Sequence, residues 1–230
     1  PLITVSHASK RLLESFTPLK NLNVVYNGLE LKEKINDKYN FKREWKIEHN
    51  KTIVGIIGPN DPHKGHATIL EVFRQSDCLK QKAQFVIVGS GNELLVDNLK
   101  SKVKKYGLEH IVTFTGFLSD DSSKIIAGFD MLVMPTIDFE GFGYSMAEAM
   151  SLEVPVIASK VGAIPEVIED GKSGLLVEPQ DIAGWKNRLE NLLENDTLCN
   201  EIAVVARKRI EENFSAKMMS QNYYDILVNK

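Results

Sequence analysis

The chain has 230 residues, of which 43% are hydrophobic and 26% are charged, and this composition is typical of a globular protein. Its formal net charge of −3 gives no general electrostatic case for nucleic-acid binding, and no apolar run approaches the ~20 residues that span a bilayer. The two cysteines, Cys78 and Cys199, lie far apart and outside any CxxC or Cys/His pattern, which favours unpaired thiols in a reducing compartment.

The first 31 residues differ in pattern from the rest of the chain. The sequence begins without Met and inside a strand-like run, so we expect it to be a piece of a longer protein. Residues 3–5 predict a short strand and residues 7–16 predict a helix. The stretch "TPLKNLNVVYNGLEL" predicts a connection, with Asn27-Gly28 as a turn signal. We expect these elements, and the elements at the other end of the chain over residues 197–212 and 216–228, to pack elsewhere than on the main sheet.

Six short apolar runs follow, and they predict the strands of one sheet. They are "TIVGIIG" (52–58), "FVIVGSG" (85–91), "IVTFTG" (111–116), "MLVMP" (131–135), "VPVIAS" (154–159) and "GLLV" (174–177). Most carry few polar residues and do not alternate, which is typical of strands that are covered on both faces, as in a parallel sheet.

The stretches between these runs keep a helical period. Leu95 and Leu99 belong to one apolar stripe, and Asp181 is suited to cap another helix. Residues 197–212 and 216–228 predict two terminal helices. Six strand–helix units in series predict an α/β fold with a Rossmann-like, doubly wound parallel sheet.

In such a sheet, ligands bind outside the carboxyl ends of the strands, so the loops after the apolar runs are the candidate site. The loop "GPNDPHKGH" runs from Gly58, at the end of a strand, to Gly65, which opens a helix, and Lys64 stands at that junction. Backbone N–H groups at a helix start and a lysine ammonium both attract anions. On this loop alone, a turn with an exposed lysine is the simpler interpretation, because the Walker pattern is absent.

The stretch "EGFGYSMAE" brackets a glycine turn with two acids, Glu140 and Glu148. The backbone N–H groups around Gly143, Tyr144 and Ser145 would start a helix and point outward, which suits a phosphate. Carboxylates accept hydrogen bonds, so the two acids suit hydroxyl groups on either side of that phosphate. The alternative makes Glu140 a solvated loop acid and Glu148 an acid favoured by the helix dipole, and spacing alone does not choose.

Two further loops carry weaker signals. Gly89 belongs to a GxG pattern that lacks the third glycine, and a tight turn explains it. Gly162 follows a strand and Pro165 starts a helix, with Glu166 in its first turn. We interpret Glu166 as a helix-start acid and not as a catalyst.

The stretch "EGFGYSMAEAMSLEVPVIASKVGAIPEVIEDGKSGLLV" closely resembles the signature of glycosyltransferase family 4, whose members are retaining enzymes of the GT-B fold that use nucleotide-sugars. "VGSG", "VTFTGF" and the "PHKG" loop follow in the order and spacing of that family. "NVVYNGLEL" resembles the segment that opens the family's C-terminal domain, and "FSAKMMSQNYYDIL" resembles its closing helix. The resemblance covers nearly the whole chain.

The resemblance implies a role for each candidate residue. Glu140, at the donor sugar, and Lys64, at the diphosphate, would be the catalytic residues, and Glu148 would bind the ribose hydroxyls. The remaining donor contacts would come from Gly58, Gly89, Phe142, Gly143, Tyr144, Ser145, Phe117 and Leu118, the last two near the base. The donor would be a UDP- or GDP-sugar, with no metal ion and no other cofactor.

One position departs from the family pattern. When Lys64-Gly65 is aligned with the family's loop, Pro59 stands where an arginine is usual. Loss of that cation would weaken the diphosphate site unless His63, Lys160 or another part of the enzyme replaces it. The alternative function is therefore a degenerate, non-catalytic module that binds nucleotide-sugars or serves assembly. An epimerase or a phosphorylase of the same fold is a third interpretation, and the E-x7-E loop argues against it.

The resemblance also predicts the domain organisation. Residues 1–26 would be a remnant of the N-terminal acceptor domain and linker, residues 27–212 the nucleotide-sugar-binding domain, and residues 213–230 a helix that returns toward the missing domain. The full enzyme would transfer a hexose-type sugar to a glycan or lipid-linked acceptor in polysaccharide biosynthesis. It would act in the cytoplasm, with a peripheral membrane contact through the missing half, and without nucleic acid. The isolated chain would be inactive.

Overall fold

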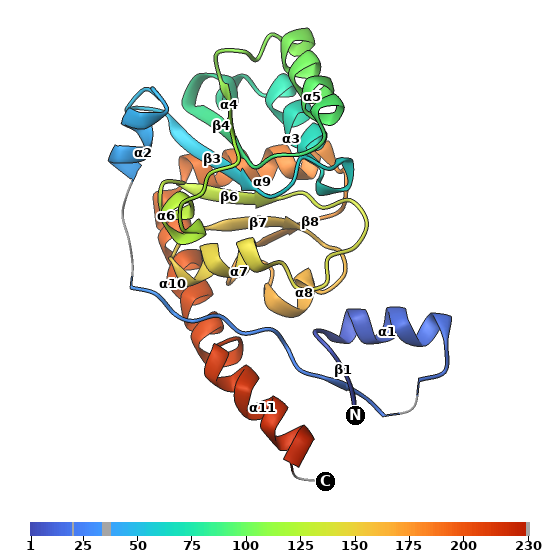
Figure 1. Ribbon diagram of the computed structural model, residues 1–230. Helices are drawn as coiled ribbons and strands as arrows, with labels where there is room; N and C mark the ends of the chain where they lie inside the picture. Colours follow the sequence, from blue (N-terminus) through green and yellow to red (C-terminus); the bar gives the residue numbers. More distant parts are fainter. Residues whose placement is uncertain (20, 34–37, 229–230) are drawn as a thin grey trace.

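The computed structural model describes residues 1–19, 21–33 and 38–228, and its centre is a parallel sheet of six strands in the order β5-β4-β3-β6-β7-β8 (Figure 1). The strands are β3 (Thr52–Ile57), β4 (Ala83–Val88), β5 (Val112–Gly116), β6 (Met131–Met134), β7 (Val156–Ser159) and β8 (Leu175–Val177). Each corresponds to one of the six apolar runs. The predicted α/β fold with a doubly wound parallel sheet is confirmed.

The strand order reverses between β3 and β6. The chain starts at β3, adds β4 and β5 on one side, and then returns to place β6 on the other side of β3. Val54 pairs with Met131 and Gly55 with Leu132 across this point. In an open α/β sheet, the helices on either side of such a reversal diverge and leave a crevice at the carboxyl ends of the strands.

Helices cover both faces of the sheet, as the non-alternating runs require. Side chains of α3, α5 and α9 belong to one buried cluster, and side chains of α6, α7 and α8 belong to another (Figure 1). These helices are α3 (His66–Gln75), α5 (Glu93–Tyr106), α6 (Ser122–Ala127), α7 (Tyr144–Ser151), α8 (Ile164–Val167) and α9 (Ile182–Glu194). Asp181 caps α9 as predicted, because its carboxylate accepts a hydrogen bond from the N–H of Gly184.

The N-terminal segment forms a small unit of its own. Strands β1 (Leu2–Thr4) and β2 (Leu22–Val24) pair in parallel, and α1 (His7–Phe16) connects them. The prediction of a plain connection over residues 17–31 was therefore wrong at β2. Three residues are too short for a periodic signal, and the strand depends on its partner β1, which lies 20 residues earlier.

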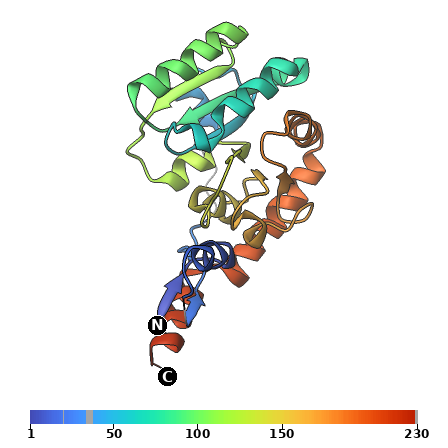
Figure 2. The ribbon, with the colours of Figure 1, turned by 90° about the vertical axis from the view of Figure 1, so that its right-hand side faces the viewer.

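The two terminal helices are α10 (Asp196–Asn213) and α11 (Ala216–Val228), close to the predicted bounds. The N–H of Leu29 donates to the carbonyl of Phe214, and the N–H of Ala216 donates to the carbonyl of Leu29. Both ribbon views place β1, α1 and α11 together at one end of the molecule (Figures 1 and 2). Among the described residues, no helix combines the length and the apolar character needed to cross a membrane.

Three short helices were not predicted from the sequence: α2 (Lys38–Glu44), α4 (Asp77–Lys82) and α6. Two of them carry a capping signal. Ser76 accepts a hydrogen bond from the N–H of Leu79 at the start of α4, and Asp121 accepts one from the N–H of Ser123 at the start of α6. Such caps are recognisable in sequence, but one or two turns give no clear apolar period.

Candidate functional site

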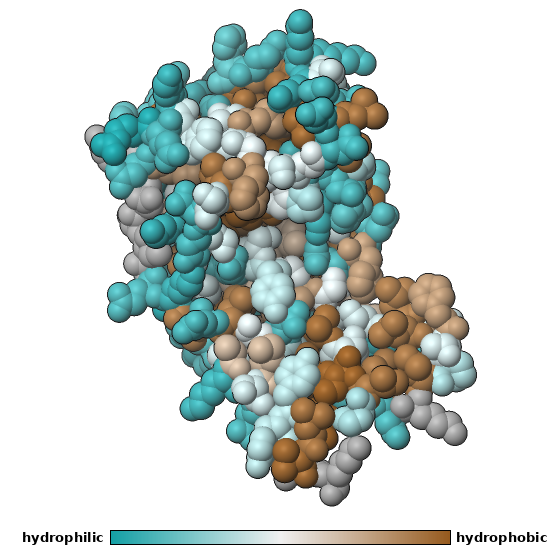
Figure 3. Space-filling model, in the orientation of Figure 1, coloured by the Kyte–Doolittle hydropathy of each residue, from teal (hydrophilic) through white to brown (hydrophobic). Residues whose placement is uncertain are grey.

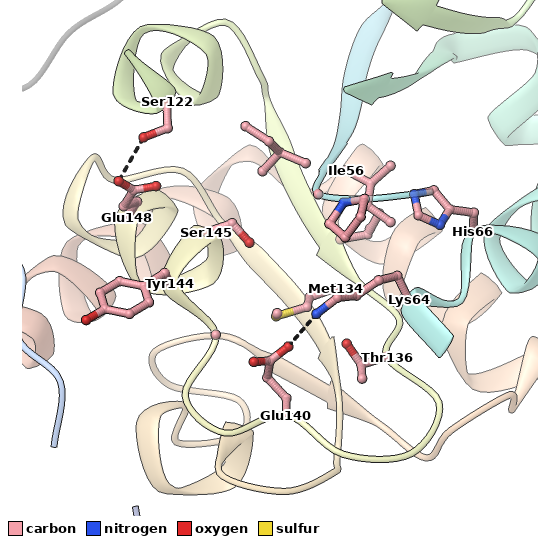
Figure 4. A pocket seen from close by; sticks show the side chains of 15 residues that line it. Ile56, Lys64, His66, Ser122, Met134, Thr136, Glu140, Tyr144, Ser145 and Glu148 are labelled. Atoms are coloured by element: carbon pink, nitrogen blue, oxygen red, sulfur yellow. Dashed lines mark hydrogen bonds and ion pairs between the residues drawn. The ribbon is translucent and has the colours of Figure 1, made fainter. Parts of the chain in front are cut away.

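A pocket of about 400 Å³ opens at the point where the strand order reverses (Figure 4). Its floor comes from the ends of β3 and β6, and its walls come from the loop after β3 and the start of α7. The lining includes Ile56, Gly58, Pro59, Lys64, His66, Ser122, Met134, Thr136, Glu140, Gly143, Tyr144, Ser145 and Glu148. The crevice predicted from the fold class therefore contains the two acids and the lysine that the loops suggested.

Lys64 and Glu140 form an ion pair across this pocket. The Lys64 Nζ lies 2.8 Å from Glu140 Oε2, and both side chains are largely buried. Lys64 ends a short 3-10 turn, Pro62–Lys64. In this turn, the carbonyl of His63 accepts a hydrogen bond from the N–H of Ile137, which follows β6. The loops after β3 and β6 are thereby tied together, and each supplies one member of the pair.

Glu148 lies on the opposite wall. Its Oε1 accepts a hydrogen bond of 2.8 Å from the hydroxyl of Ser122, the first residue of α6 (Figure 4). This leaves further acceptor capacity on the carboxylate, which has two oxygens and several lone pairs. Sequence reasoning missed Ser122, although the Asp121 cap marks the start of its helix.

The start of α7 lies between the two acids. Gly143 precedes the helix with φ of 87° and provides no side-chain cap for the N–H groups that follow. Glu140 is held next to this start by its backbone, because its carbonyl accepts a hydrogen bond of 2.8 Å from the N–H of Ala163. Uncapped N–H groups and the helix dipole make this helix start suited to an anion.

A second hollow of about 530 Å³ adjoins the pocket and shares Ile57, Gly58, Pro59 and Ser122 with it. It is lined by Gly89, Phe117, Leu118 and other residues of the loops after β4 and β5. The Phe117 side chain is 75% exposed at its rim. An exposed aromatic face beside an apolar hollow is suited to a planar ring such as a nucleobase.

The charge around the pocket is short of cations. Pro59 lines it where the family pattern places an arginine, and the lining supplied by the described residues holds one ammonium, of Lys64, against two carboxylates. Neither proposed substitute faces this pocket: the His63 ring lies 2.6 Å from Asp61, and Lys160 lies 3.5 Å from Glu178. Among the described residues, no group of three His, Cys, Asp or Glu side chains is arranged to hold a metal ion.

Two buried polar side chains, unpredicted from sequence, complete the pocket. His66 is 2% exposed, and neither ring nitrogen has a hydrogen-bond partner among the described residues. The same holds for the hydroxyl of Thr136 on the other side of Lys64. Burial, together with the neighbouring charges of Lys64 and His63, lowers the pKa of His66 to about 4, whereas the backbone and the charge of Asp61 oppose the shift. His66 is therefore neutral at physiological pH.

The stability of the chain should depend on the protonation of His66. Because its pKa is about 4 in the folded chain and 6.5 for an ordinary solvated histidine, the unfolded state binds more protons between these values. The stabilisation of the folded chain that is linked to neutral His66 is present above pH 6.5 and is lost as the pH falls toward 4. From about pH 7.5 to about pH 5, wild type should lose roughly 2 kcal/mol more unfolding free energy than His66→Gln. Urea unfolding of both proteins at the two pH values measures this, and equal losses would contradict it.

The structure places the predicted site residues in two groups. Gly58, Lys64, Glu140, Glu148 and residues 143–145 line the first pocket, whereas Gly89, Phe117 and Leu118 line the second hollow. Phe142 is 2% exposed and its ring packs against Tyr144 and Phe214, so its side chain does not line either.

The interpretation of Glu166 needs a correction. It lies in the first turn of α8, as predicted, but its carboxylate accepts hydrogen bonds from the backbone of α1 and not from α8. The partners His7 and Ala8 lie more than 150 residues earlier, so no local signal predicts the contact.

Comparison with known families gives a match to the family described as "Glycosyl transferases group 1" over residues 37–209. Among curated proteins, the N-acetyl-alpha-D-glucosaminyl L-malate synthase of Bacillus anthracis is 30% identical over 221 residues, which are 93% of this chain and 56% of that protein. The chain thus spans about half the length of the curated relatives it matches.

Two solved structures are also similar. The structure of Anabaena Alr3699/HepE in complex with UDP-glucose matches 99% of this chain and 63% of that one, with a TM-score of 0.91 and 25% identity. The C-terminal domain of a glycosyl transferase group 1 family protein from Francisella tularensis matches 82% of this chain and 100% of that one, with a TM-score of 0.72 and 27% identity.

Proposed function

Because the chain belongs to the glycosyl transferases group 1 family, we propose that it forms the donor-binding half of a retaining glycosyltransferase. The single observation that carries this proposal is the pocket where Lys64, the uncapped start of α7 and the two acids Glu140 and Glu148 converge. The relative solved with UDP-glucose has the same fold and supports a nucleotide-sugar as the ligand.

In the proposed complex, the donor extends from the second hollow into the first. The base lies beside Phe117 and Leu118, and the ribose hydroxyls donate to Glu148. The diphosphate receives hydrogen bonds from the N–H groups of Tyr144 and Ser145. The sugar then lies at Glu140 and the glycine turn, next to the Lys64 ammonium.

The ion pair between Lys64 and Glu140 suggests how the site responds to the donor. A diphosphate competes with Glu140 for the Lys64 ammonium, and its arrival releases the Glu140 carboxylate for a sugar hydroxyl. When the bond between the anomeric carbon and the phosphate oxygen breaks, the electron pair stays with the nucleotide, and Lys64 stabilises that charge. Glu140 stabilises the positive charge that develops on the sugar.

We infer that the full enzyme retains the anomeric configuration, as the E-x7-E pair suggests. Retention requires the acceptor hydroxyl to attack from the face that the diphosphate leaves. NMR of the first product formed by the full enzyme decides this, and an inverted product would refute it.

The two acids should differ in their effect on nucleotide affinity. Glu148→Ala removes the proposed ribose contacts and should weaken UDP binding by about 10- to 100-fold, the usual value of charge-assisted hydrogen bonds. Glu140→Ala should change UDP affinity by less than about threefold, because UDP lacks the sugar and Lys64 gains freedom to bind phosphate. Isothermal titration of UDP into both variants tests this. Equal losses in the two variants would contradict the assigned roles.

Donor binding is also proposed to need no metal ion, since Lys64 and the start of α7 both act on the diphosphate. The same titration with EDTA and with Mg²⁺ tests this, and binding that requires Mg²⁺ would contradict it. Comparison of UDP- and GDP-sugars in that assay also identifies the base.

The acceptor is proposed to bind to another part of the full protein. The end of the molecule formed by α1 and α11 carries an apolar surface, visible at the lower right and bottom of Figure 3. Phe16 is 80% exposed there, and Leu12, Leu13, Tyr224 and Leu227 are also exposed. We propose that the acceptor-binding half packs on this surface. Residues 1–230 alone would then lack the acceptor site and would be inactive in transfer. Transfer by the isolated chain at ordinary rates would overturn this.

A second candidate function follows from Pro59. With one ammonium against two carboxylates in its described lining, the pocket is poorly suited to drive departure of a charged nucleotide. A non-catalytic module that binds nucleotide-sugars is consistent with this charge balance. The full protein distinguishes the two: transfer at ordinary rates excludes the second candidate, whereas donor binding without turnover supports it.

A further inference from the structure

The Glu166 carboxylate caps a helix to which it does not belong. Its two oxygens accept hydrogen bonds from the N–H groups of His7, at 2.9 Å, and Ala8, at 2.6 Å, which are the first two residues of α1. The third N–H group, of Ser9, donates to the hydroxyl of Ser6. The N–H groups of His7, Ala8 and Ser9 therefore all have partners, and two of these three bonds depend on one side chain from α8.

Glu166 is itself held firmly. The hydroxyl of Tyr26 donates to Oε2 at 2.8 Å, and burial together with this carboxylate raises the pKa of Tyr26. Arg209 donates to the backbone carbonyls of Glu166 and Val167, which fixes the end of α8. The Glu166 side chain is 16% exposed. Because the partly buried Glu166 carboxylate accepts several hydrogen bonds at once, it fixes the positions of the groups that donate to it.

Two connections link the Glu166 carboxylate and its partners to the glycine turn, Gly141–Gly143. The first is the backbone: the N–H of Ala163, directly before α8, donates to the carbonyl of Glu140. The second is a row of aromatic rings: Tyr26 packs on Phe214, Phe214 on Phe142, and Phe142 on Tyr144, with centroid separations of 5.3, 5.9 and 5.2 Å. The backbone connection ends at Glu140, at the proposed sugar end of the glycine turn. The row of rings ends on the Tyr144 side chain, whereas the proposed diphosphate contact is the Tyr144 N–H.

The first turn of α1 and the residue Val5 before it also lie beside the glycine turn. A Cβ placed on Gly141 would lie 3.7 Å from the Ser9 hydroxyl and 3.9 Å from a methyl group of Val5. Val5 and Ser9 thus leave room for about one methyl group beside Gly141, the residue that follows Glu140. Because Glu166 sets the position of α1, it also determines how close Val5 and Ser9 lie to the residue that follows Glu140.

We propose that Glu166 is a positioning residue for the donor sugar. It holds the first turn of α1 beside Gly141. The first turn of α1 in turn fixes the position of the Glu140 backbone, so that the Glu140 carboxylate can reach the sugar. This inference rests on the proposed donor site. It assigns Glu166 no contact with the donor, and it predicts an effect on the sugar end of the pocket but not on the nucleotide end, where Glu148 and the start of α7 act.

Titration of UDP and UDP-glucose into the chain and its Glu166→Ala and Glu166→Gln variants tests the proposal. Both variants should bind UDP within about twofold of wild type and bind UDP-glucose about fivefold more weakly, the lower range of measured coupling between sites. Glu178→Ala is the control, because this exposed acid pairs with Lys160, outside the cluster around Glu166. Equal losses for both ligands, or no loss for either, would overturn the proposal.

Amide hydrogen exchange without nucleotide separates this proposal from the proposed function. In Glu166→Gln, exchange should accelerate both at residues 7–9 and at residues 140–143. Acceleration confined to residues 7–9 would overturn the positioning role. If wild type binds no nucleotide, the proposed function fails, and the exchange result still decides whether Glu166 positions the glycine turn. Glu166→Gln provides every measurement if Glu166→Ala does not fold.

Discussion

Lys64→Ala should weaken UDP binding by about 100-fold, which corresponds to about 2.7 kcal/mol. The described lining of the pocket holds no second cation besides Lys64. Pro59 stands at the arginine position, and His66 is neutral. A charge-assisted hydrogen bond contributes about 1.5–3 kcal/mol, and the variant also leaves Glu140 as an unpaired negative charge beside the diphosphate. Isothermal titration of UDP into the wild type and the variant measures the effect.

Lys160→Ala provides the control for this prediction. Lys160 lies beside Glu178 and outside the pocket, so its removal should change UDP affinity by less than about twofold. A loss of less than threefold for Lys64→Ala would show that the diphosphate does not reach this ammonium. The helix start alone would then hold the diphosphate.

Gly65→Ala should lower the unfolding free energy by about 2–4 kcal/mol. Gly65 has φ of 75°, and a Cβ there would lie 1.8 Å from the carbonyl oxygen of Pro135. The loop after β3 must therefore move away from β6, and Lys64 moves with it. Urea unfolding measures the loss of stability, and the UDP affinity of the folded variant should fall as well.

Gly107→Ala separates backbone strain from the close contact. Gly107 has a similar φ of 68°, but a Cβ there would meet nothing within 4 Å. This variant should lose about 1–2 kcal/mol, the cost of the left-handed conformation alone. Equal losses in the two variants would show that the contact with Pro135 relaxes freely.

Five of the six strands were predictable because each is a run of apolar residues that is largely buried on both faces, whereas the edge strand β5 is partly exposed and its run alternates. Burial on both faces removes the polar alternation, and this leaves a signal in the sequence itself. The general position of the site was also predictable, since ligands in such a sheet bind at the carboxyl ends of the strands. Lys64 and Glu140 could be named as candidates because they stand in loops after such runs, and Glu148 because it lies in the helix after the second of these loops; their roles came from the family resemblance.

The parts that sequence reasoning missed depend on contacts between distant segments. The partner of Glu148 is Ser122, 26 residues earlier, and the partners of Glu166 lie more than 150 residues away. His66 and Thr136 carry no local pattern that marks a polar side chain as buried and unpartnered. The starts of α4 and α6 are the exceptions, because their caps, Ser76 and Asp121, were visible in the sequence.

A crystal structure of the chain with UDP tests the central claim most directly. It should show the diphosphate within hydrogen-bond distance of the Lys64 Nζ and of the N–H groups at the start of α7. The ribose hydroxyls should contact Glu148, and the uracil should lie beside Phe117. UDP bound elsewhere, for example in the separate hollow lined by Lys100 and Asp97, would contradict the proposed site.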